Sequence, residues 1–497
     1  MTSIALAEWL QLWLDTDSDQ PAYHQLYLLF RKAILTGKLP PDSRLPASRL
    51  LAKDLGIARN TIIQVYEQLA LEGYVHATTG KGTFVADVSQ DSIEDGPAGE
   101  TAASPNVAPY PSLSQRGVRL VHRLGFSNRQ QGAFMSGVPD ISEFPFKTWQ
   151  RIQNKRWRNQ PEDLLGYAPA GGYEPLRHAI SAYVNSARSV NSSARQVIIT
   201  TGIHQGVDVI TRLLTEPGDL VWIEEPSYWG LRNLLLSSGL RVKGIAVDAE
   251  GLNPDPQQMK HPPKLIVITP SHQYPLGMVM SLSRRRMLLE YAHQHGCWIV
   301  EDDYDSEFRF GSRPLQSLQG LDEWGRVLYA GSFSKMMYPG LRTGYLVVPV
   351  PLADHFANAV AELYREGRLM TQANLAEFLA EGYLSSHVRR VRNLYASRRQ
   401  CLIHAIQRRY GNSLEIIGDD AGLHLVLGLP DGVDDMAIAH MALQRGIIVR
   451  PLSDYYLDGR QAKKGLLLGF GCVSEEQINA AFPTLGEVID AALAKIS

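Results

Sequence analysis

The sequence predicts an α/β protein in which a large domain with a mainly parallel sheet follows a small α+β domain. Three observations support this prediction. At 497 residues the chain is too long for one compact core, which favours two or more domains. Residues 87–116 are rich in Ser, Pro, Ala, Gly and acidic residues and contain few large apolar ones. Beyond them, short β-rich runs alternate with helical patterns, as in a parallel sheet that helices cover on both faces.

The composition limits the kinds of partner and compartment. Apolar residues make up 44% of the chain and charged residues 20%, which is typical of globular proteins. Lys and Arg total 49 against 51 Asp and Glu, so nucleic-acid binding requires a local basic patch. The three cysteines, Cys297, Cys401 and Cys472, are far apart and lack metal-ligand spacing. We therefore expect a reducing compartment, no disulfide framework and no metal site.

The chain divides at the polar segment into four parts. Residues 1–19 begin with "MTSIALAEWLQLWLD", whose apolar stretch is short and interrupted by Glu8, so it predicts an amphipathic helix and neither a signal peptide nor a membrane span. We expect the protein to be cytoplasmic. Residues 20–86 form the small domain and residues 117–497 the large one. Between them, residues 87–116 cannot bury enough apolar surface to offset their ordering entropy, which predicts a flexible linker.

The small domain has the pattern of a helix-turn-helix with a wing. After an amphipathic helix at residues 22–36, Ser48 is placed to cap a short helix that Gly56 ends. A second helix starts at about Arg59, and "YVHATTGKGTFVA" predicts two strands around a tight turn. In such domains the second helix enters the major groove of DNA. A two-helix turn with a glycine also occurs in many enzymes, so the motif alone does not establish DNA binding.

Basic and polar residues lie where this arrangement meets DNA. Arg59, Asn60 and Thr61 begin the second helix, where Arg can donate two bonds to guanine and Asn or Thr can bind bases or phosphates. Arg49 in the preceding helix and Lys81 in the wing are expected near the DNA backbone or minor groove.

The whole segment "LPASRLLAKDLGIARNTIIQVYEQLALEGYVHATTGKGTFV" resembles the winged helix-turn-helix of GntR-type transcription regulators. The matching features are "LPASR", "RNT", "LEGY" and "GKGTFV". The resemblance implies a double-stranded DNA operator as partner. It also implies DNA contact by Arg49, Arg59, Asn60, Thr61, Lys81, Gly82 and Thr83.

In the large domain, Lys335 stands in "GSFSKMMYPGLRTGY", between serines and an arginine with glycines on both sides. Such a lysine is usually solvated. In a partly dry site, however, its amine becomes a nucleophile toward carbonyls. The cofactor that exploits this chemistry is pyridoxal 5′-phosphate (PLP), which needs an acid opposite its pyridine nitrogen and a phosphate cradle. Five runs predict strands, and each ends in polar or glycine residues: "QVIITTG", "DLVWIEEP", "KLIVITP", "CWIVEDD" and "RVLYAGS".

Candidates for the parts of such a site follow these strands. The acid is in "CWIVEDDYDSEFRF", where Glu301, Asp302 and Asp303 end a strand and Tyr304 follows, although such clusters also bind metals or only water. A phosphate cradle is predicted in "TTGIHQGVDVITRLL", where a helix starts directly after a strand. By itself this is an ordinary strand-to-helix junction. Ser332 and Arg342 can complete the cradle, and Tyr228 in "EEPSYWG" can stack on a ring.

From about residue 126 to its end, the chain resembles fold-type I PLP enzymes of the aspartate aminotransferase kind, because "SFSK" followed by "LRTGY" matches their internal-aldimine motif. The resemblance implies that Lys335 forms the aldimine, Asp302 pairs with the pyridine nitrogen, and Tyr304 reaches the ring hydroxyl. It further implies that Tyr228 stacks on the ring and that Tyr167, in "LGYAPAGGYEPLR", reaches the phosphate of a neighbouring subunit in a homodimer. The implied phosphate ligands are Gly202, Ile203, His204, Ser332 and Arg342.

The chain departs from aminotransferases at two places. Where they carry Asn-Pro, this chain has "PSHQYPLG", with Tyr274 in place of the asparagine and His272 and Gln273 nearby. Where they carry the arginine that binds the substrate carboxylate, this chain has Leu467. Arg450 is a candidate substitute, and His272 is a second candidate for effector binding. Ordinary transamination is therefore in doubt, and the amino-acid specificity stays open.

A GntR-like domain joined by a linker to an aminotransferase-like body resembles the MocR-type regulators over nearly the whole chain. This resemblance implies a PLP-dependent regulator that senses PLP, an amine or an amino acid through the Lys335 aldimine. It also implies a dimer with swapped, head-to-tail heads. One alternative is an active aminotransferase with an accessory N-terminal domain, because Lys335, Asp302 and Arg342 permit half-reactions. Another is a PLP store without chemistry.

Overall fold

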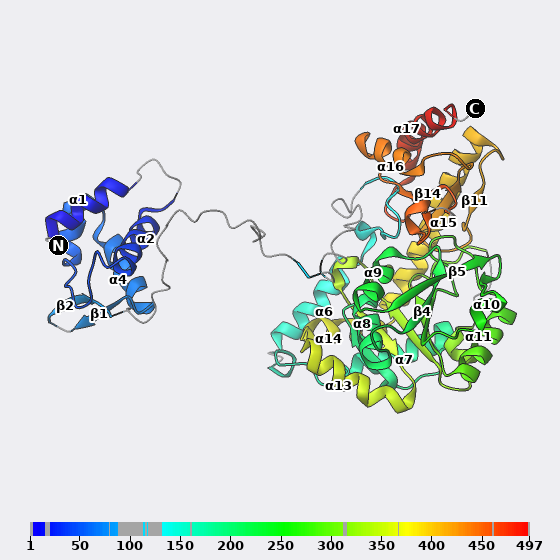
Figure 1. The fold of residues 1–497 in the computed structure, drawn as a ribbon, viewed down its shortest axis with the longest axis horizontal. Coiled ribbons are helices and arrows are strands. Elements are labelled where there is room, and N and C mark those ends of the chain that lie inside the picture. Colours follow the sequence, from blue (N-terminus) through cyan, green and yellow to red (C-terminus); the bar gives the residue numbers. More distant parts are fainter. Residues whose placement is uncertain are drawn as a thin grey trace, which may run out of the picture. The chain divides into compact units, whose positions relative to one another are not determined.

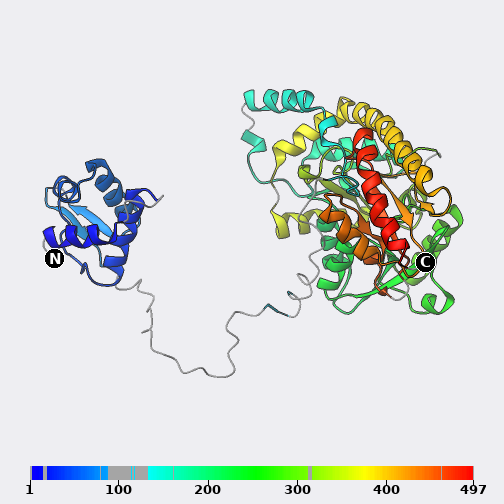
Figure 2. The ribbon, with the colours of Figure 1, turned by 90° about the horizontal axis from the view of Figure 1, so that it is seen from above.

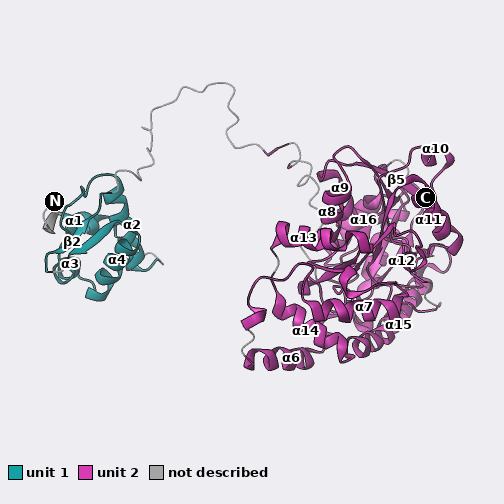
Figure 3. Cartoon of the chain, turned by 90° about the horizontal axis from the view of Figure 1, so that it is seen from below, with its two compact units in different colours: residues 1–111 teal, residues 112–497 magenta. Residues whose placement is uncertain are grey.

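The chain, shown by a computed structural model, divides into two compact units, residues 1–111 (unit 1) and residues 112–497 (unit 2), which Figure 3 colours separately. The structure describes residues 3–14, 20–78, 80–87, 113–114, 117, 132–159, 162–311, 316–365, 367–459 and 462–495. The predicted linker, residues 87–116, lies almost wholly outside these ranges, and the predicted domain boundaries stay predictions.

Unit 1 is a helical domain with a two-stranded wing. Its elements in order are α1 (Ser3–Trp13), α2 (Ala22–Leu35), α3 (Ser48–Leu55), α4 (Arg59–Leu71), β1 (Val75–Thr78) and β2 (Gly82–Val85). The predicted N-terminal helix is confirmed as α1. It buries Leu6, Ala7 and Leu10 in the same core as α2, α3 and α4, so it is part of this unit's fold.

The helix-turn-helix forms as predicted, with one difference at the start of α3. Gly56 ends α3 in the left-handed conformation, with φ +69°, which glycine adopts without a steric cost. The capping role expected of Ser48 is wrong: Ala47 occupies the cap position, and Ser48 is the first helical residue. The hydroxyl of Ser48 instead accepts a weak hydrogen bond from Arg59 Nε, 3.5 Å away, at the start of α4.

Unit 2 is built on an eight-stranded mixed sheet, drawn in Figure 1. The strands in spatial order are β3 (Val197–Thr200), β10 (Gly344–Val347), β9 (Val327–Ser332), β8 (Trp298–Asp303), β7 (Leu265–Ile268), β4 (Leu220–Glu225), β5 (Arg241–Asp248) and β6 (Gly251–Leu252). The pairs from β9 through β5 are parallel, whereas β10 runs antiparallel to both its neighbours. Strands β3, β9, β8, β7 and β4 therefore all end at one edge, and the five predicted runs are confirmed as strands.

Helices cover both faces of this sheet. On one face the apolar core includes side chains of α7 (Glu174–Arg188), α11 (Leu282–His295) and α14 (Leu369–Ala380). On the other face it includes side chains of α8 (Ile203–Leu214), α9 (Trp229–Ser237) and α13 (Ala353–Tyr364). The remaining helices near this sheet are α6 (Phe146–Arg158), α10 (Pro256–Met259) and α12 (Leu318–Leu321). Since both faces are buried, the central strands are nearly uniformly apolar, as the sequence predicted.

The C-terminal part of unit 2 forms a second layer around a four-stranded antiparallel sheet. Its strands in spatial order are β11 (Ile416–Ile417), β12 (His424–Gly428), β14 (Gly465–Gly469) and β13 (Arg450–Pro451). Figure 1 shows α16 (Asp435–Gln444) and α17 (Glu475–Leu493) beside this sheet, and the long helix α15 (Tyr383–Tyr410) packs against α17. Among the described residues, no helix combines the length and the apolar character that a membrane span requires.

Candidate functional site

The surface of unit 1 at the start of α4 exposes the residues predicted to bind DNA. Arg59 and Asn60 are exposed in the first turn of α4, and Thr61 is half-buried beside them. Arg49, the second residue of α3, is also exposed. The hydrogen bond from Arg59 to Ser48 shows that the N-terminal ends of α3 and α4 lie close together, which is the arrangement that can meet a DNA groove.

The wing brings in an arginine that the sequence did not single out. β1 and β2 pair in antiparallel register from Val75 with Val85 to Thr78 with Gly82, and Lys81 is exposed at the turn. Arg44 lies against this wing: a Cβ built on Gly82 would be 2.9 Å from Arg44 Nε, and Gly82 has φ +117°. Gly82 therefore allows the guanidinium of Arg44 to approach the wing backbone.

In unit 2, the three acids that end β8 point to different surroundings because side chains alternate along a strand. Glu301 accepts hydrogen bonds from the backbone N–H groups of Leu318 (2.9 Å) and Gln319 (2.8 Å), at the start of α12. The carboxyl of Asp302 points to the opposite face and makes no hydrogen bond with a described residue. The structure thus separates Asp302 from the two acids beside it.

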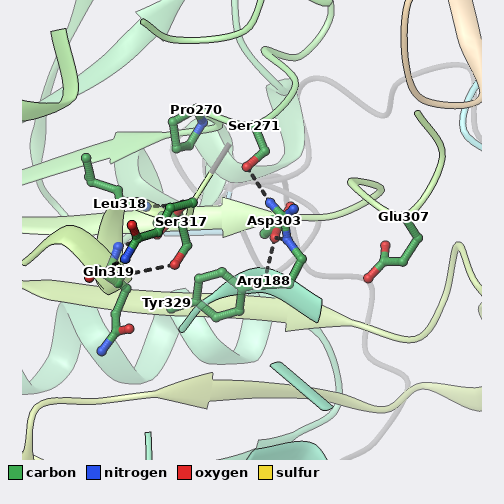
Figure 4. A network of polar contacts seen from close by, with 12 residues as sticks. Arg188, Pro270, Ser271, Asp303, Glu307, Ser317, Leu318, Gln319 and Tyr329 are labelled. Atoms are coloured by element: carbon green, nitrogen blue, oxygen red, sulfur yellow. Dashed lines mark hydrogen bonds and ion pairs between the residues drawn. The ribbon is translucent and has the colours of Figure 1, made fainter. Parts of the chain in front are cut away.

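Asp303 belongs to a buried polar network, drawn in Figure 4. Arg188 Nε, at the end of α7, lies 2.6 Å from Asp303 Oδ2, and the hydroxyl of Tyr329 donates to the same oxygen at 2.5 Å. Arg188 also donates to the hydroxyl of Ser271 at 2.7 Å. The network therefore ties α7, β8 and β9 to the loop after β7, which carries His272.

Lys335 lies just beyond the end of β9, on the Asp302 side of the site. Its Nζ donates a hydrogen bond to the carbonyl oxygen of Gly137. Burial lowers the pKa of Lys335, while the carboxyls of Asp305 and Asp302 oppose this effect. A lowered pKa increases the fraction of neutral amine, which is the nucleophilic form.

Burial also changes the acid that faces this lysine. It raises the pKa of Asp302 to about 8, and the carboxyls of Asp303 and Asp305 act in the same direction. Lys335 lowers it to a smaller extent. Strongly perturbed pKa values in one cluster are typical of functional sites, and here the perturbed groups are an acid and an amine at adjacent strand ends.

His272 and Tyr304 meet beside Asp305, a residue that the sequence did not single out. His272 Nδ1 lies 3.1 Å from Asp305 Oδ1 and 2.9 Å from the hydroxyl of Tyr304. That hydroxyl also donates to the carbonyl oxygen of His272 at 3.0 Å. With Nδ1 facing the carboxylate, the buried Nε2 of His272 has no hydrogen-bond partner within the described part of the chain.

The predicted phosphate cradle lies at the start of α8. Gly202 precedes this helix with φ +124°, and a Cβ built on it would be 3.9 Å from a guanidinium nitrogen of Arg342. Burial lowers the pKa of His204, and the positive charge of Arg342 adds to that effect. Ser332 ends β9, where its hydroxyl accepts from the backbone N–H of Ser334 at 3.2 Å. The free N–H groups of a helix start, a glycine and an arginine form a suitable anion site.

A pocket of about 320 Å³ opens beside this cradle. Thr200, Thr201 and Gln205 line it, together with the arginines Arg342 and Arg368. Arg368 donates to the carbonyl oxygen of Arg342 at 3.5 Å. The pocket is therefore strongly basic, which suits an anionic ligand.

Aromatic side chains surround the site next to the second sheet. The ring of Tyr228 stacks on His204, with centroids 5.6 Å apart, and lies edge-on to Tyr274 at 5.9 Å. The hydroxyls of Tyr274 and Tyr455 are 3.3 Å apart. Burial raises the pKa of all three phenols, and the charge of Arg450 acts on each of them in the opposite direction. Arg450 therefore lies near the site, and on β13 it pairs in register with Leu467 of β14.

Tyr167 lies apart from this cluster. Its side chain is 82% exposed, and it lines a pocket of about 200 Å³ with Gly171, Val360 and Arg365. The structure thus brings the other predicted site residues of unit 2 to one edge of the sheet, whereas Tyr167 points outward.

The residues present fit PLP. Asp302 is a buried acid without a hydrogen bond among the described residues, and it faces an amine whose pKa burial lowers. The α8 start offers Gly202 and Arg342 for a phosphate, and the buried Nε2 of His204 has no partner in the described structure. Within the described ranges, no group of three His, Cys, Asp or Glu side chains is placed to hold a metal ion.

Comparison with known families divides the chain in the same way as the fold. Residues 22–85 match the family described as bacterial regulatory proteins, gntR family. Residues 136–480 match aminotransferase class I and II.

Two similar proteins and one similar structure cover most of the chain. The probable rhizopine catabolism regulatory protein MocR of Rhizobium meliloti is 38% identical over 95% of each chain. The pyridoxine biosynthesis transcriptional regulator PdxR of Corynebacterium glutamicum is 30% identical over 94% of this chain and 95% of its own. The Pyrococcus horikoshii kynurenine aminotransferase, solved with PMP, covers 73% of this chain and 92% of its own at 25% identity and a TM-score of 0.67.

Proposed function

Since the chain belongs to the MocR-type regulators of the GntR family, we propose that unit 2 binds PLP and senses it, or an amine or amino acid, through Lys335. The protein is a transcriptional regulator with a GntR-type helix-turn-helix and an aminotransferase-like domain. Its ligand changes the affinity of the two heads for a double-stranded DNA operator. A ligand can do so only through unequal affinity for two arrangements of the protein.

The observation that carries this proposal is that the buried carboxyl of Asp302 makes no hydrogen bond within the described part of the chain and interacts electrostatically with Lys335. Asp303, the next residue, is neutralised by Arg188 at 2.6 Å, whereas Asp302 has only the field of Lys335 and neighbouring acids. A buried acid without a hydrogen bond is costly unless a ligand supplies the partner. A protonated pyridine nitrogen is such a partner.

When bound, PLP supplies an aldehyde that condenses with amines and a ring that withdraws electrons. The residues of this chain have separate tasks around it. Asp302 holds the ring nitrogen protonated, and Lys335 presents a neutral amine. The α8 start with Ser332 and Arg342 binds the phosphate, and Tyr228 covers one ring face. Tyr304, oriented by His272, is available to the ring hydroxyl.

The position of Arg450 supports an effector that carries a carboxylate group. The sequence has Leu467 where aminotransferases bind the substrate carboxylate, and Arg450 stands directly across from it on the neighbouring strand. Its charge acts on the phenols of Tyr228 and Tyr274 in the site. We propose that Arg450 binds the carboxylate of an amino-acid effector, with His272 nearby.

An active aminotransferase is the alternative. Unlike a sensor, it needs a base that moves a proton on the bound substrate. Lys335 can accept a proton as a neutral amine, because burial lowers its pKa. Against turnover stands Tyr274, whose bulky ring packs against Tyr304 at 5.6 Å where aminotransferases have an asparagine. For this reason we propose a sensor rather than an aminotransferase that turns over substrate.

A homodimer with swapped heads stays part of the proposal. Tyr167 is 82% exposed, so a second subunit can be reached by its hydroxyl, as the resemblance implies. Unit 1 exposes Arg49, Arg59 and Asn60 for the operator.

The test is a titration of the full-length protein with PLP, followed by visible absorbance. We expect a new absorption band in the wild type that Lys335→Ala lacks, while the exposed Lys260→Ala retains it. Adding amines and amino acids should shift that band, and the same ligands should change affinity for a duplex selected from a random pool by about 5- to 150-fold. A band that persists in Lys335→Ala, or no band in the wild type, contradicts the proposal. A steady release of keto acid would favour the aminotransferase.

A further inference from the structure

Two helices of unit 2 carry a concentrated positive charge. α6 contains five Lys and Arg residues and α15 contains seven, and neither helix contains an acidic residue. The chain as a whole has a net charge of −2, so this charge is local. Exposed helices usually mix both signs, which makes two helices of a single sign informative.

On α6 the basic residues form a stripe. Lys147, Arg151, Lys155 and Arg158 are spaced i, i+4, i+8 and i+11, which places them on one helical face, and all four are exposed. The buried residue of the helix is Ile152. The stripe is about 16 Å long at 1.5 Å per residue.

The first half of α15 continues this surface. Arg389 and Arg392 are exposed and one turn apart. The two helices meet where Arg151 donates to the hydroxyl of Tyr383, the first residue of α15, at 2.7 Å. Figures 2 and 3 show both helices along the same edge of unit 2. We call the exposed residues Lys147, Arg151, Lys155, Arg158, Arg389 and Arg392 the basic face.

Nearby acids neutralise only part of this charge. Glu377 of α14 pairs with Lys155 at 3.1 Å and with Arg156 at 2.9 Å, and Glu143 pairs with Arg390. Further along α15, Arg398, Arg399 and Arg409 pair with Asp140, Asp419 and Asp490. Three members of the basic face make no side-chain hydrogen bond or ion pair with any described residue: Lys147, Arg158 and Arg389. These three exposed cations therefore have no ion-pair partner within the described part of the chain and are available to an external anion.

We propose that the basic face binds the phosphate backbone of the DNA that unit 1 reads. The proposal rests on the regulator function above and extends it, because it assigns DNA contact to the aminotransferase-like unit. A ladder of Arg and Lys at single-turn spacing suits a polyanion, and Arg binds phosphate oxygens in bidentate fashion. Such contacts add affinity and carry no sequence information. The basic face thus increases the affinity for DNA, whereas Arg59 and Asn60 determine the preference for a sequence.

The experiment uses the full-length protein and a fluorescent 60-base-pair duplex with the selected operator at its centre. We compare the wild type with the triple variant Lys147→Gln, Arg158→Gln and Arg389→Gln, whose side chains leave no partner behind. The matched control is Arg241→Gln, Lys243→Gln and Lys260→Gln, three exposed cations on β5 and at the end of α10. Dissociation constants are measured at several salt concentrations.

Each lost phosphate contact reduces the slope of log affinity against log salt by about 0.9. We expect the triple variant to have a slope smaller by about two to three, with unchanged preference for the operator over a scrambled duplex. The control should keep the wild-type slope. Equal slopes for wild type and triple variant, or an equal loss in the control, would overturn the proposal. Arg59→Ala separates the two proposals: it should abolish operator preference, and a wild type without operator preference contradicts the regulator function itself.

Discussion

Asp302 and Asp303 are neighbours on β8 with the same side chain, both buried, and their surroundings are opposite. Asp303 has an ion pair with Arg188 and a hydrogen bond from Tyr329. Asp302 has no hydrogen bond among the described residues and faces Lys335. The difference teaches that a buried charge neutralised inside the protein supports structure, whereas one left without a partner creates a demand that a ligand can satisfy.

The two surroundings are also coupled. Burial is the main cause of the raised pKa of Asp302, and the charge of Asp303 contributes to it. Arg188 additionally holds Ser271, the residue before His272 (Figure 4). Arg188 therefore connects the carboxyl of Asp303 to the loop that carries His272.

The largest expected effect on stability comes from removing the ion pair between Arg188 and Asp303. Arg188→Leu leaves the carboxylate of Asp303 buried without its ion-pair partner, which should reduce the free energy of unfolding by about 3–5 kcal/mol. Urea unfolding followed by circular dichroism measures this loss. The matched control is Arg195→Leu, because Arg195 pairs with Asp354 at the surface, where the two side chains are 64% and 67% exposed. It should cost far less than Arg188→Leu, because water screens an exposed ion pair. Equal losses in the two variants would contradict our view of the buried pair.

A second, smaller effect is expected on PLP affinity when Asp302 is changed. Asp302→Asn removes a charge-assisted hydrogen bond to the pyridine nitrogen, worth about 1.5–3 kcal/mol, so PLP should bind about 10- to 150-fold more weakly. Equilibrium dialysis measures the dissociation constant. Tyr329→Phe removes a hydrogen bond to Asp303 and leaves Asp302 in place, so it should change PLP affinity less than about threefold. If both variants weaken PLP equally, the two acids are not functionally distinct.

The smallest effect concerns pH in the absence of PLP. Burial raises the pKa of Asp302 to about 8, whereas an unfolded aspartate titrates near 4. The folded state therefore holds this proton more tightly, and wild-type stability contributed by the protonated acid is lost as pH rises from about 4 through 8. Asp302→Asn lacks this loss, so its stability relative to the wild type should increase with pH, by about 1 kcal/mol or more at pH 8. A difference that is constant across this range would contradict the prediction.

Local sequence was sufficient for much of the fold. Gly56 between two apolar helical patterns predicted the helix-turn-helix, and the five β-rich runs predicted strands that the structure confirms. Lys335 and Gly202 were identified because their neighbours along the chain, a serine pair and a helix start, belong to the same short motifs. Such features depend on backbone conformation and side-chain period, which nearby residues decide.

The partners of these residues were decided by tertiary structure. The pattern "EDD" specifies alternation, but only the packing of α7 on one sheet face brings Arg188 to Asp303 and leaves Asp302 to Lys335. Asp305 beside His272, Arg44 beside Gly82, and α6 beside α15 join segments that are distant in sequence or carry no local motif. The physical reason is that sequence period determines which face of an element is apolar, whereas contacts between elements depend on how those faces pack together.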